Sequence, residues 1–253
     1  MEVHHHSSPG HKKKAFKEYF LEFLMIFLAV TMGFLAENLR EHITNRSKEK
    51  EYVAGFIRNL QDDTANLRYV IQFDSLQVIG IDRFLRLSHA NMQEDSNRKK
   101  FYNFSYNCFY NSSAFVSNNS TLQQLKSTGD YRLVQKDHVA DSLSKYDTDN
   151  QGISNQTNYY NAYFKEVLSL LDGVTDMSIF GDTTFMKNGK FTHQKVPDLG
   201  GDSKQLRTLF NKAFDLRIIT SSYAANMLRP QLENAARLIV FLRKEYGITE
   251  EAN

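Results

Sequence analysis

One acidic residue lies inside the most apolar stretch of the sequence, where an ionisable group can carry chemistry. Glu22 is the only charged residue between Tyr19 and Ala36, a stretch of eighteen residues. A carboxylate in hydrocarbon is costly and marks an ion or proton pathway by default. The first hypothesis is therefore an oligomer whose helices gather Glu22 into a polar cluster. The plainer alternative, which we favour, is that Glu22 lies one turn from the membrane edge and reaches the lipid headgroups.

Small residues share a helical face with Glu22. Ala29 and Gly33 form a small-xxx-small step, which allows membrane helices to approach closely. On an ideal helix five residues fall within about 40° of one line. They are the predicted membrane-helix interface: Glu22, Ala29, Gly33, Ala36 and Arg40. This face predicts a homo-oligomer in which Glu22 points at a partner helix rather than at lipid.

A second group of chemically interesting side chains is aromatic. The spacing places four residues near one face of a predicted helix over 101–115: Phe101, Phe104, Cys108 and Phe115. They are candidates for an aromatic ligand pocket. The favoured alternative is a helix that packs these side chains into a core. Cys108 among aromatic rings is then a small buried residue rather than a nucleophile.

The remaining candidates for chemistry are weak. His4, His5, His6 and His11 could bind a transition metal, but a tail without further ligands is better explained as incidental or as a short tag. The acidic pair Asp62-Asp63 is expected on a solvated helix face. No phosphate-loop, dinucleotide, zinc-protease or nucleophile-elbow motif occurs in the sequence. We therefore predict a protein that is not an enzyme and that has no metal or cofactor.

The apolar stretch that holds Glu22 predicts a transmembrane helix over residues 18–38. Eighteen helical residues are about 27 Å long, close to the roughly 30 Å hydrocarbon core of a bilayer. Tyr19 and Phe20 lie at one end, where interfacial aromatic residues are favoured. The polar segment 1–17 before it is expected to be a tail whose lysines meet anionic headgroups.

Two other interpretations of this stretch are weaker. A cleaved signal peptide would need a small residue two positions before Ala36, where the sequence has Phe34, and no cysteine is present there for lipoprotein processing. A buried core helix that is apolar all round would need partners on every side. A membrane span remains the leading prediction.

The charges around the span do not fix its orientation. Lysine and arginine flank its two ends in equal number. Before the span lie Lys12, Lys13, Lys14 and Lys17, and after it lie Arg40, Arg46, Lys48 and Lys50. The first cluster is the tighter one, and long domains translocate largely regardless of charge. We predict a single-pass protein of the inner membrane with a cytoplasmic N-terminus and a periplasmic C-terminal domain.

Residues 39–253 predict an elongated antiparallel helical bundle, so the chain is all-α. Val53, Leu60 and Leu67 repeat at seven, which indicates a helix with one buried face that runs on from the span to about Leu87. Asn188-Gly189 indicates a short β-hairpin excursion near 183–192. The expected helix boundaries and interruptions are Asn119 or Ser120, Gly129, Asp137, Gly152, Ser203, Pro230 and Gly247.

The composition of the chain excludes further classes of protein and supports a helical one. The 253 residues carry a formal net charge of +2, so nothing indicates nucleic-acid binding. The single cysteine, Cys108, excludes an intrachain disulfide. Three prolines and no tryptophan fit long helices with few breaks.

Three stretches of the chain carry a resemblance to a known family. They are "KEYFLEFLMIFLAVTMGFLAENLREH", "EKEYVAGFIRNLQDD" and "TLQQLKSTGDYRLV". They resemble an uncharacterised family of single-pass membrane proteins of the Bacteroidota, in which an N-terminal span with an embedded acid leads into a helix bearing an acidic pair. The likeness covers about a third of the chain. It implies location and architecture and carries over no catalytic residue.

These observations predict a membrane-anchored interaction or sensory module that oligomerises through its span. Its partners would be the lipid bilayer, further copies of itself and another protein of the cell envelope. Two alternatives stay open. One is a ligand-sensing bundle that uses the aromatic residues and a separate transmitter protein. The other is an ion- or proton-conducting oligomer that uses Glu22.

Overall fold

The structure is a computed structural model that describes residues 11–180, 186–187, 190–191 and 196–249. It confirms the all-α class, because nearly all described residues with regular structure are helical. The chain divides into two compact units, Met1–Tyr52 (unit 1) and Val53–Asn253 (unit 2). Helix α1 (His11–Leu85) runs through both. The tail predicted over 1–17 is therefore already helical from His11, and the histidines at positions 4–6 lie outside the described residues.

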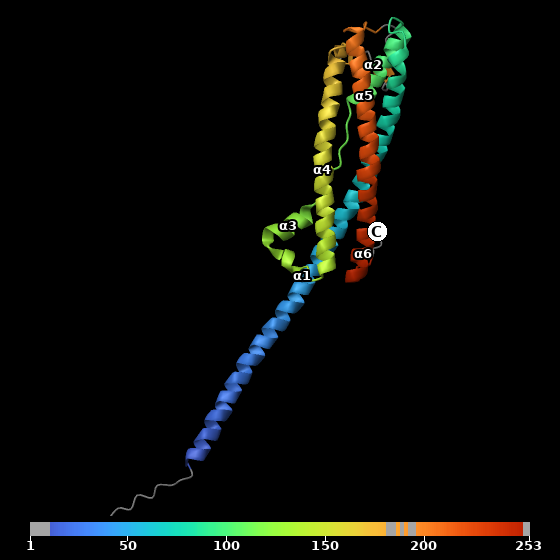
Figure 1. The fold of residues 1–253 in the computed structure, drawn as a ribbon. Coiled ribbons are helices and arrows are strands. Elements are labelled where there is room, and N and C mark those ends of the chain that lie inside the picture. Colours follow the sequence, from blue (N-terminus) through green and yellow to red (C-terminus); the bar gives the residue numbers. More distant parts are fainter. Residues whose placement is uncertain (1–10, 181–185, 188–189, 192–195, 250–253) are drawn as a thin grey trace, which may run out of the picture. The chain divides into compact units, whose positions relative to one another are not determined.

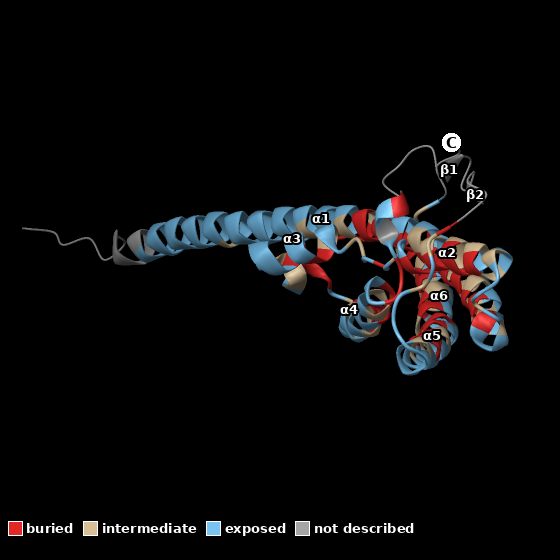
Figure 2. Cartoon of the chain, turned by 90° about the horizontal axis from the view of Figure 1, so that it is seen from above, coloured by how far each residue is buried: buried red, intermediate tan, exposed pale blue. Residues whose placement is uncertain are grey.

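Unit 1 consists of the first part of α1. An 18-residue window of this helix has a mean hydropathy of 2.0, and none of the window is buried. Its large apolar side chains are exposed, for example Phe23 at 64% and Phe34 at 75%. In Figure 2 this part of the helix is coloured almost entirely as exposed, whereas unit 2 contains many residues coloured as buried. The helix is long and apolar enough to span a membrane.

Unit 2 is built from the rest of α1 and the helices that follow. Figure 1 shows α4, α5 and α6 running alongside this part of α1. The α-helices after α1 are α2 (Asp95–Phe109), α3 (Ser120–Thr128), α4 (Asp137–Asp172), α5 (Ser203–Tyr223) and α6 (Arg229–Tyr246). Short 3-10 segments are η1 (Arg86–His89), η2 (Asp130–Leu133) and η3 (Met177–Phe180), and η4 (Ala224–Leu228) is a π-helical turn.

The core of unit 2 is aromatic at one end. Phe84 of α1 packs against Phe101 and Phe109 of α2 and Phe210 of α5, with ring centroids 5.0–5.2 Å apart. Such ring pairs contribute about 0.5–1.5 kcal/mol each beyond the area they bury. A second cluster further along the helices joins Leu67, Val70, Phe115, Ile153, Tyr223 and Leu228.

The helices begin and end largely where the sequence predicts. Gly129 and Gly247 end α3 and α6 in the left-handed conformation, with φ of 72° and 60°. Helix α4 begins at Asp137 and runs through Gly152 without a break. The N-cap of α5 is Asp202 rather than Ser203. Its side chain accepts a bond from the backbone N of Gln205, and the Gln205 side chain accepts one from the backbone N of Asp202 in return.

The proline in the last helical stretch restarts the helix, as expected. Pro230 has no N–H and cannot bond the carbonyl four residues earlier. The π-helical turn η4 lies directly before it, and α6 begins at Arg229. Between α4 and α5 two short strands, β1 (Met186–Lys187) and β2 (Lys190–Phe191), pair antiparallel. The Asn-Gly turn between them lies outside the described residues.

Candidate functional site

The predicted membrane-helix interface lies on an exposed face of α1. Glu22, Ala29, Gly33 and Ala36 are all exposed in the single chain. An added Cβ at Gly33 would meet nothing within 4 Å, so no described part of the chain requires glycine there. Arg40 is engaged locally, because its Nε donates to Glu37 Oε2 at 3.0 Å. No described cation pairs with Glu22.

Three residues of the predicted aromatic pocket, Phe101, Phe104 and Cys108, share one hydrophobic cluster, but Phe115 does not join them. Helix α2 ends at Phe109, so the prediction of one helix over 101–115 was wrong. Phe115 lies in an irregular segment and packs in the second cluster. Phe101 is fully buried in the aromatic core. Only Phe104 and Cys108 line a common hollow, of about 310 Å³.

Cys108 is a packing residue, as expected. Its side chain is 3% exposed, and burial raises the pKa of the thiol to about 12. A cysteine that stays protonated at neutral pH is a poor nucleophile. A Cβ added at Gly80 would lie 2.6 Å from the Cys108 Sγ. Gly80, which weakens α1 locally, therefore allows α2 to approach α1 at this point.

The acidic pair contradicts the prediction of a solvated face. Asp62 is exposed, but Asp63 is 1% exposed and its carboxylate is fully engaged. Ser117 Oγ donates to Asp63 Oδ2 at 2.7 Å, and the backbone N of Asn118 donates to Oδ1 at 2.6 Å. The Tyr146 hydroxyl donates to Oδ2 at 2.7 Å. Three donors thus compensate a charge that burial would otherwise make costly.

The bonds of Asp63 belong to a network that crosses unit 2. Asn150 Nδ2 donates to Ser117 Oγ at 2.8 Å, and Gln231 Nε2 donates to Asn150 Oδ1 at 2.6 Å. The network ties α1, the segment after α2, α4 and α6 together. Burial is the largest cause and raises the pKa of Asp63 above its ordinary value, although the hydrogen bonds from Asn118, Ser117 and Tyr146 oppose this rise. We interpret this arrangement as one that stabilises the packing of these segments rather than as a reactive centre.

A second buried carboxyl, Asp74, has no such compensation. The residue is 2% exposed, and its Oδ2 is buried with no hydrogen-bond partner among the described residues. Burial raises the pKa of this carboxyl to about 7. Burial is the one cause of this shift, and no charged group among the described residues opposes it. Asp74 is therefore a group that can take up or release a proton near neutral pH.

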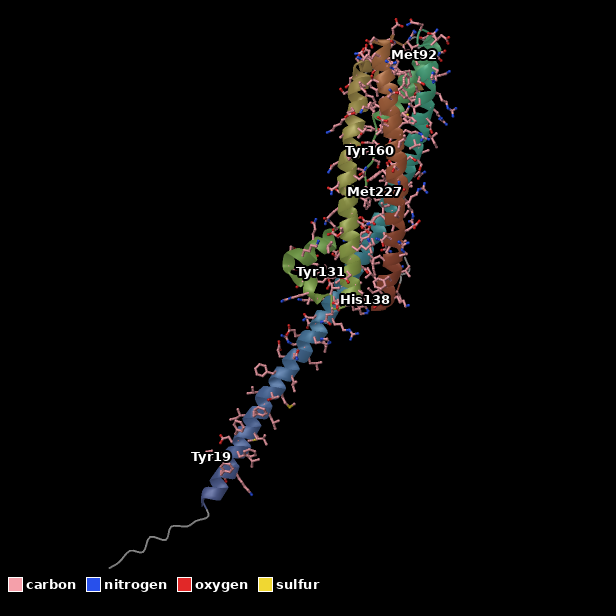
Figure 3. The ribbon with its side chains drawn as sticks, in the orientation of Figure 1. Tyr19, Met92, Tyr131, His138, Tyr160 and Met227 are labelled. Carbon is pink, nitrogen blue, oxygen red and sulfur yellow. The ribbon has the colours of Figure 1, made fainter. Side chains whose placement is uncertain are left out.

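Tyr160 of α4 and Tyr223 of α5 are close enough to Asp74 to interact with its charge. Tyr160 is labelled in Figure 3, and its hydroxyl donates to Gln77 Oε1 at 2.8 Å. The hydroxyls of Tyr223 and Thr157 lie 2.8 Å apart. Burial is the largest cause that raises the pKa of Tyr160 and Tyr223, and the charge of Asp74 adds to it. The cluster is polar, buried and built from three helices.

A signal for both buried acids was present in the sequence. Asp63 lies three residues after Leu60 and four before Leu67, within the buried heptad stripe of α1. Asp74 lies seven residues after Leu67 and seven before Ile81, both of which are fully buried. A carboxylate at a core heptad position predicts a partner or a shifted pKa. Aspartate is usually found at the protein surface, so the heptad position of these two residues was not taken as a sign of burial.

The described residues offer no metal centre, since no three His, Cys, Asp or Glu among them are grouped to hold an ion. No protein-family model, curated protein or solved structure matches the chain. Function must therefore be inferred from the features of the chain itself.

Proposed function

We propose that this protein is a non-enzymatic, membrane-anchored interaction module that self-associates through the first part of α1. The observation that carries the proposal is the exposed apolar surface of that helix. Its mean hydropathy is 2.0 over a window with no buried residue, so no described part of the chain covers this surface. A bilayer and a second copy of the helix would together cover it.

The glycine on the interface face supports self-association. Gly33 lies in the interior of α1, where glycine costs roughly 0.5–1 kcal/mol relative to alanine in a helix. Open space surrounds it, so packing within the chain does not explain the cost. Close approach of a partner helix would explain it, because glycine and alanine let two backbones come together.

Substitution in the span tests this proposal. Ala29→Leu with Gly33→Leu should weaken crosslinking of the full chain in membranes, because two bulky side chains separate the helices. Thr31→Leu is the matched control, since Thr31 lies about 160° around the helix from Gly33. Unchanged crosslinking of the double variant would contradict self-association through this face. Loss of crosslinking in both variants would contradict the assignment of the face.

Glu22 favours a second candidate function, an ion- or proton-conducting oligomer. Its carboxylate has no described partner and lies on the same face as Gly33. In liposomes that contain the full chain, Glu22→Gln should abolish flux if Glu22 conducts. Under the interaction proposal liposomes with the unchanged chain should show no flux above empty liposomes.

The location completes the proposal. Unit 2 would face the periplasm, with the N-terminus in the cytoplasm and the span in the inner membrane, and its partner would be another envelope protein. The tight lysine cluster before the span supports this orientation.

A further inference from the structure

A groove opens at the end of unit 2 where α1 gives way to η1. It lies between the last turn of α1, the segment 86–92 and the first half of α5. Its volume is about 560 Å³, within the range of roughly 300–1,000 Å³ that is typical of small-molecule sites. Met92, one of its lining residues, is labelled in Figure 3 at this end of the helices.

The floor of the groove is apolar and well supported. Its apolar lining includes Leu85, Leu87, Met92, Leu206, Phe210 and Phe214. Phe210 is 8% exposed and packs against Phe84 and Phe101, at centroid distances of 5.0 and 6.1 Å. The floor is thus the outer surface of the aromatic core, which holds its shape because interiors are close-packed.

The rim of the groove is polar and carries positive charge. Its polar lining consists of Ser88, His89, Ser203, Arg207 and Asn211, and all five are exposed. Among the residues that the structure describes, no carboxylate lines the groove. The side chains of Arg207 and His89 have no ion pair or hydrogen bond with another described residue. The guanidinium of Arg207 is therefore free to bind an anion, and hydroxyl, imidazole and amide groups lie around the same groove.

We propose that this groove binds a single-chain amphiphile with an anionic head, such as a fatty carboxylate or an alkyl phosphate. The floor would take the alkyl chain, and Arg207 with the polar rim would hold the head. The unpaired positive charge selects an anionic head over a cationic one. The volume suits one small molecule rather than a folded partner. The site does not depend on self-association of the span.

A tryptophan reporter makes binding measurable. The chain contains no tryptophan, so Phe214→Trp places a single one in the groove. Phe214 is 50% exposed and accepts the larger ring without disturbing the core. Val240→Trp is the matched reporter outside the groove, on α6, where Val240 is 67% exposed. Both variants are prepared as the full chain in phospholipid nanodiscs.

The probe is dodecanoate brominated near its methyl end, because bromine quenches tryptophan fluorescence on contact. We expect saturable quenching of Phe214→Trp and none of Val240→Trp. Brominated dodecyl phosphate distinguishes a carboxylate from a phosphate ligand, and quenching by either supports the proposal. Brominated dodecyl-trimethylammonium, whose head is cationic, should not quench the fluorescence of Phe214→Trp. Absence of quenching by both anionic probes, or equal quenching of the two reporters, would overturn the site.

Charge removal tests the head-group contact. In the Phe214→Trp chain, Arg207→Gln should weaken binding about tenfold or more, the usual effect of losing a charge-assisted hydrogen bond. Arg237→Gln, an exposed position on α6, is the control and should change nothing. Each CH₂ added to a short chain should tighten binding about fourfold until the floor is filled. Binding that is insensitive to Arg207→Gln and equal for the cationic probe would overturn the anionic specificity.

Discussion

At the scale of the residue, burial raises the pKa of two aspartates of α1, but only one of them has hydrogen bonds that oppose the rise. Asp63 accepts three hydrogen bonds, from Ser117, the backbone of Asn118 and Tyr146. Asp74 is equally buried and has an oxygen without a partner. The difference is one of surroundings, since an ion in a protein interior is tolerated where donors replace the lost water. We therefore expect the protonation of Asp74 to make the free energy of unfolding depend on pH.

Asp74 predicts a specific pH dependence of stability. The folded state holds its proton up to about pH 7, whereas the unfolded chain releases it near the ordinary pKa of 3.8. The folded state thus binds more protons between these values, and the free energy of unfolding should fall as pH rises through this window. The slope contributed by Asp74 is at most about 1.4 kcal/mol per pH unit.

The prediction is checked by urea unfolding of the full chain, followed by circular dichroism between pH 5 and 7 in about half-unit steps. Asp74→Asn removes the titrating group and should flatten the curve relative to the unchanged chain. Asp63 remains in both proteins, so its contribution cancels in the comparison. Parallel curves for the two proteins would show that Asp74 does not titrate in this range.

Gly80 predicts a substitution effect opposite to helix propensity. Alanine normally stabilises a helix by up to about 1 kcal/mol relative to glycine. At Gly80 the new Cβ would lie 2.6 Å from the Cys108 Sγ, so Gly80→Ala should lower the free energy of unfolding by about 1–3 kcal/mol through overpacking. Thermal or urea unfolding measures the change.

Two comparisons isolate the cause at Gly80. Gly152→Ala, in α4, has nothing within 4 Å of the new Cβ and should stabilise the protein. The double variant Gly80→Ala with Cys108→Ala should recover part of the loss, because the clashing sulfur is gone. A double variant that is less stable than the sum of its single changes would argue against the contact between these two positions.

At the scale of the element, the network of Asp63 holds the irregular segment after α2 against three helices. Tyr146→Phe removes one of its donors and leaves the ring in place. We expect a loss of about 1.5–3 kcal/mol in the free energy of unfolding, as for a hydrogen bond to a charged group. Tyr159→Phe, at an exposed tyrosine of the same helix, should change stability little. Equal effects of the two substitutions would remove the special role of Asp63.

The helices themselves were predictable from the sequence, and the exceptions have physical reasons. Periodic apolar residues and left-handed glycines placed α1, α3, α4 and α6 closely. The aromatic helix was extended too far, because spacing was followed through Asn111-Ser112-Ser113, a cluster typical of loops. Phe115 then reaches the core from the irregular segment. Spacing cannot show such a change of backbone.

The buried polar clusters and the groove were not predictable in the same way. Asp63 is satisfied by residues 54 and 83 positions away in the chain, and one sequence carries no sign of such pairs. The groove joins α1 and α5, whose lining residues are more than 100 positions apart. Only the heptad positions of Asp63 and Asp74 were visible beforehand. The hydrogen-bond partners of Asp63 and the lining of the groove depend on tertiary contacts, which the sequence alone does not show.

At the scale of the whole molecule, the protein consists of an exposed apolar helix and a helical unit with its own core. Unit 2 carries the buried networks and the groove, and unit 1 carries the candidate span. In this account the span sets location and self-association, and unit 2 meets partners or ligands. The two roles can be tested separately, because the substitutions in each unit are distinct.

Topology is the measurement that tests the central claim most directly. A reporter enzyme that is active only outside the cytoplasm would be fused after Asn253 and assayed in intact cells, together with alkaline extraction of the membranes. The account predicts reporter activity from an uncleaved chain that resists extraction. Release of the chain from the membrane, or cleavage near Ala36, would contradict the anchor. A membrane-bound chain without reporter activity would contradict the orientation and place unit 2 in the cytoplasm.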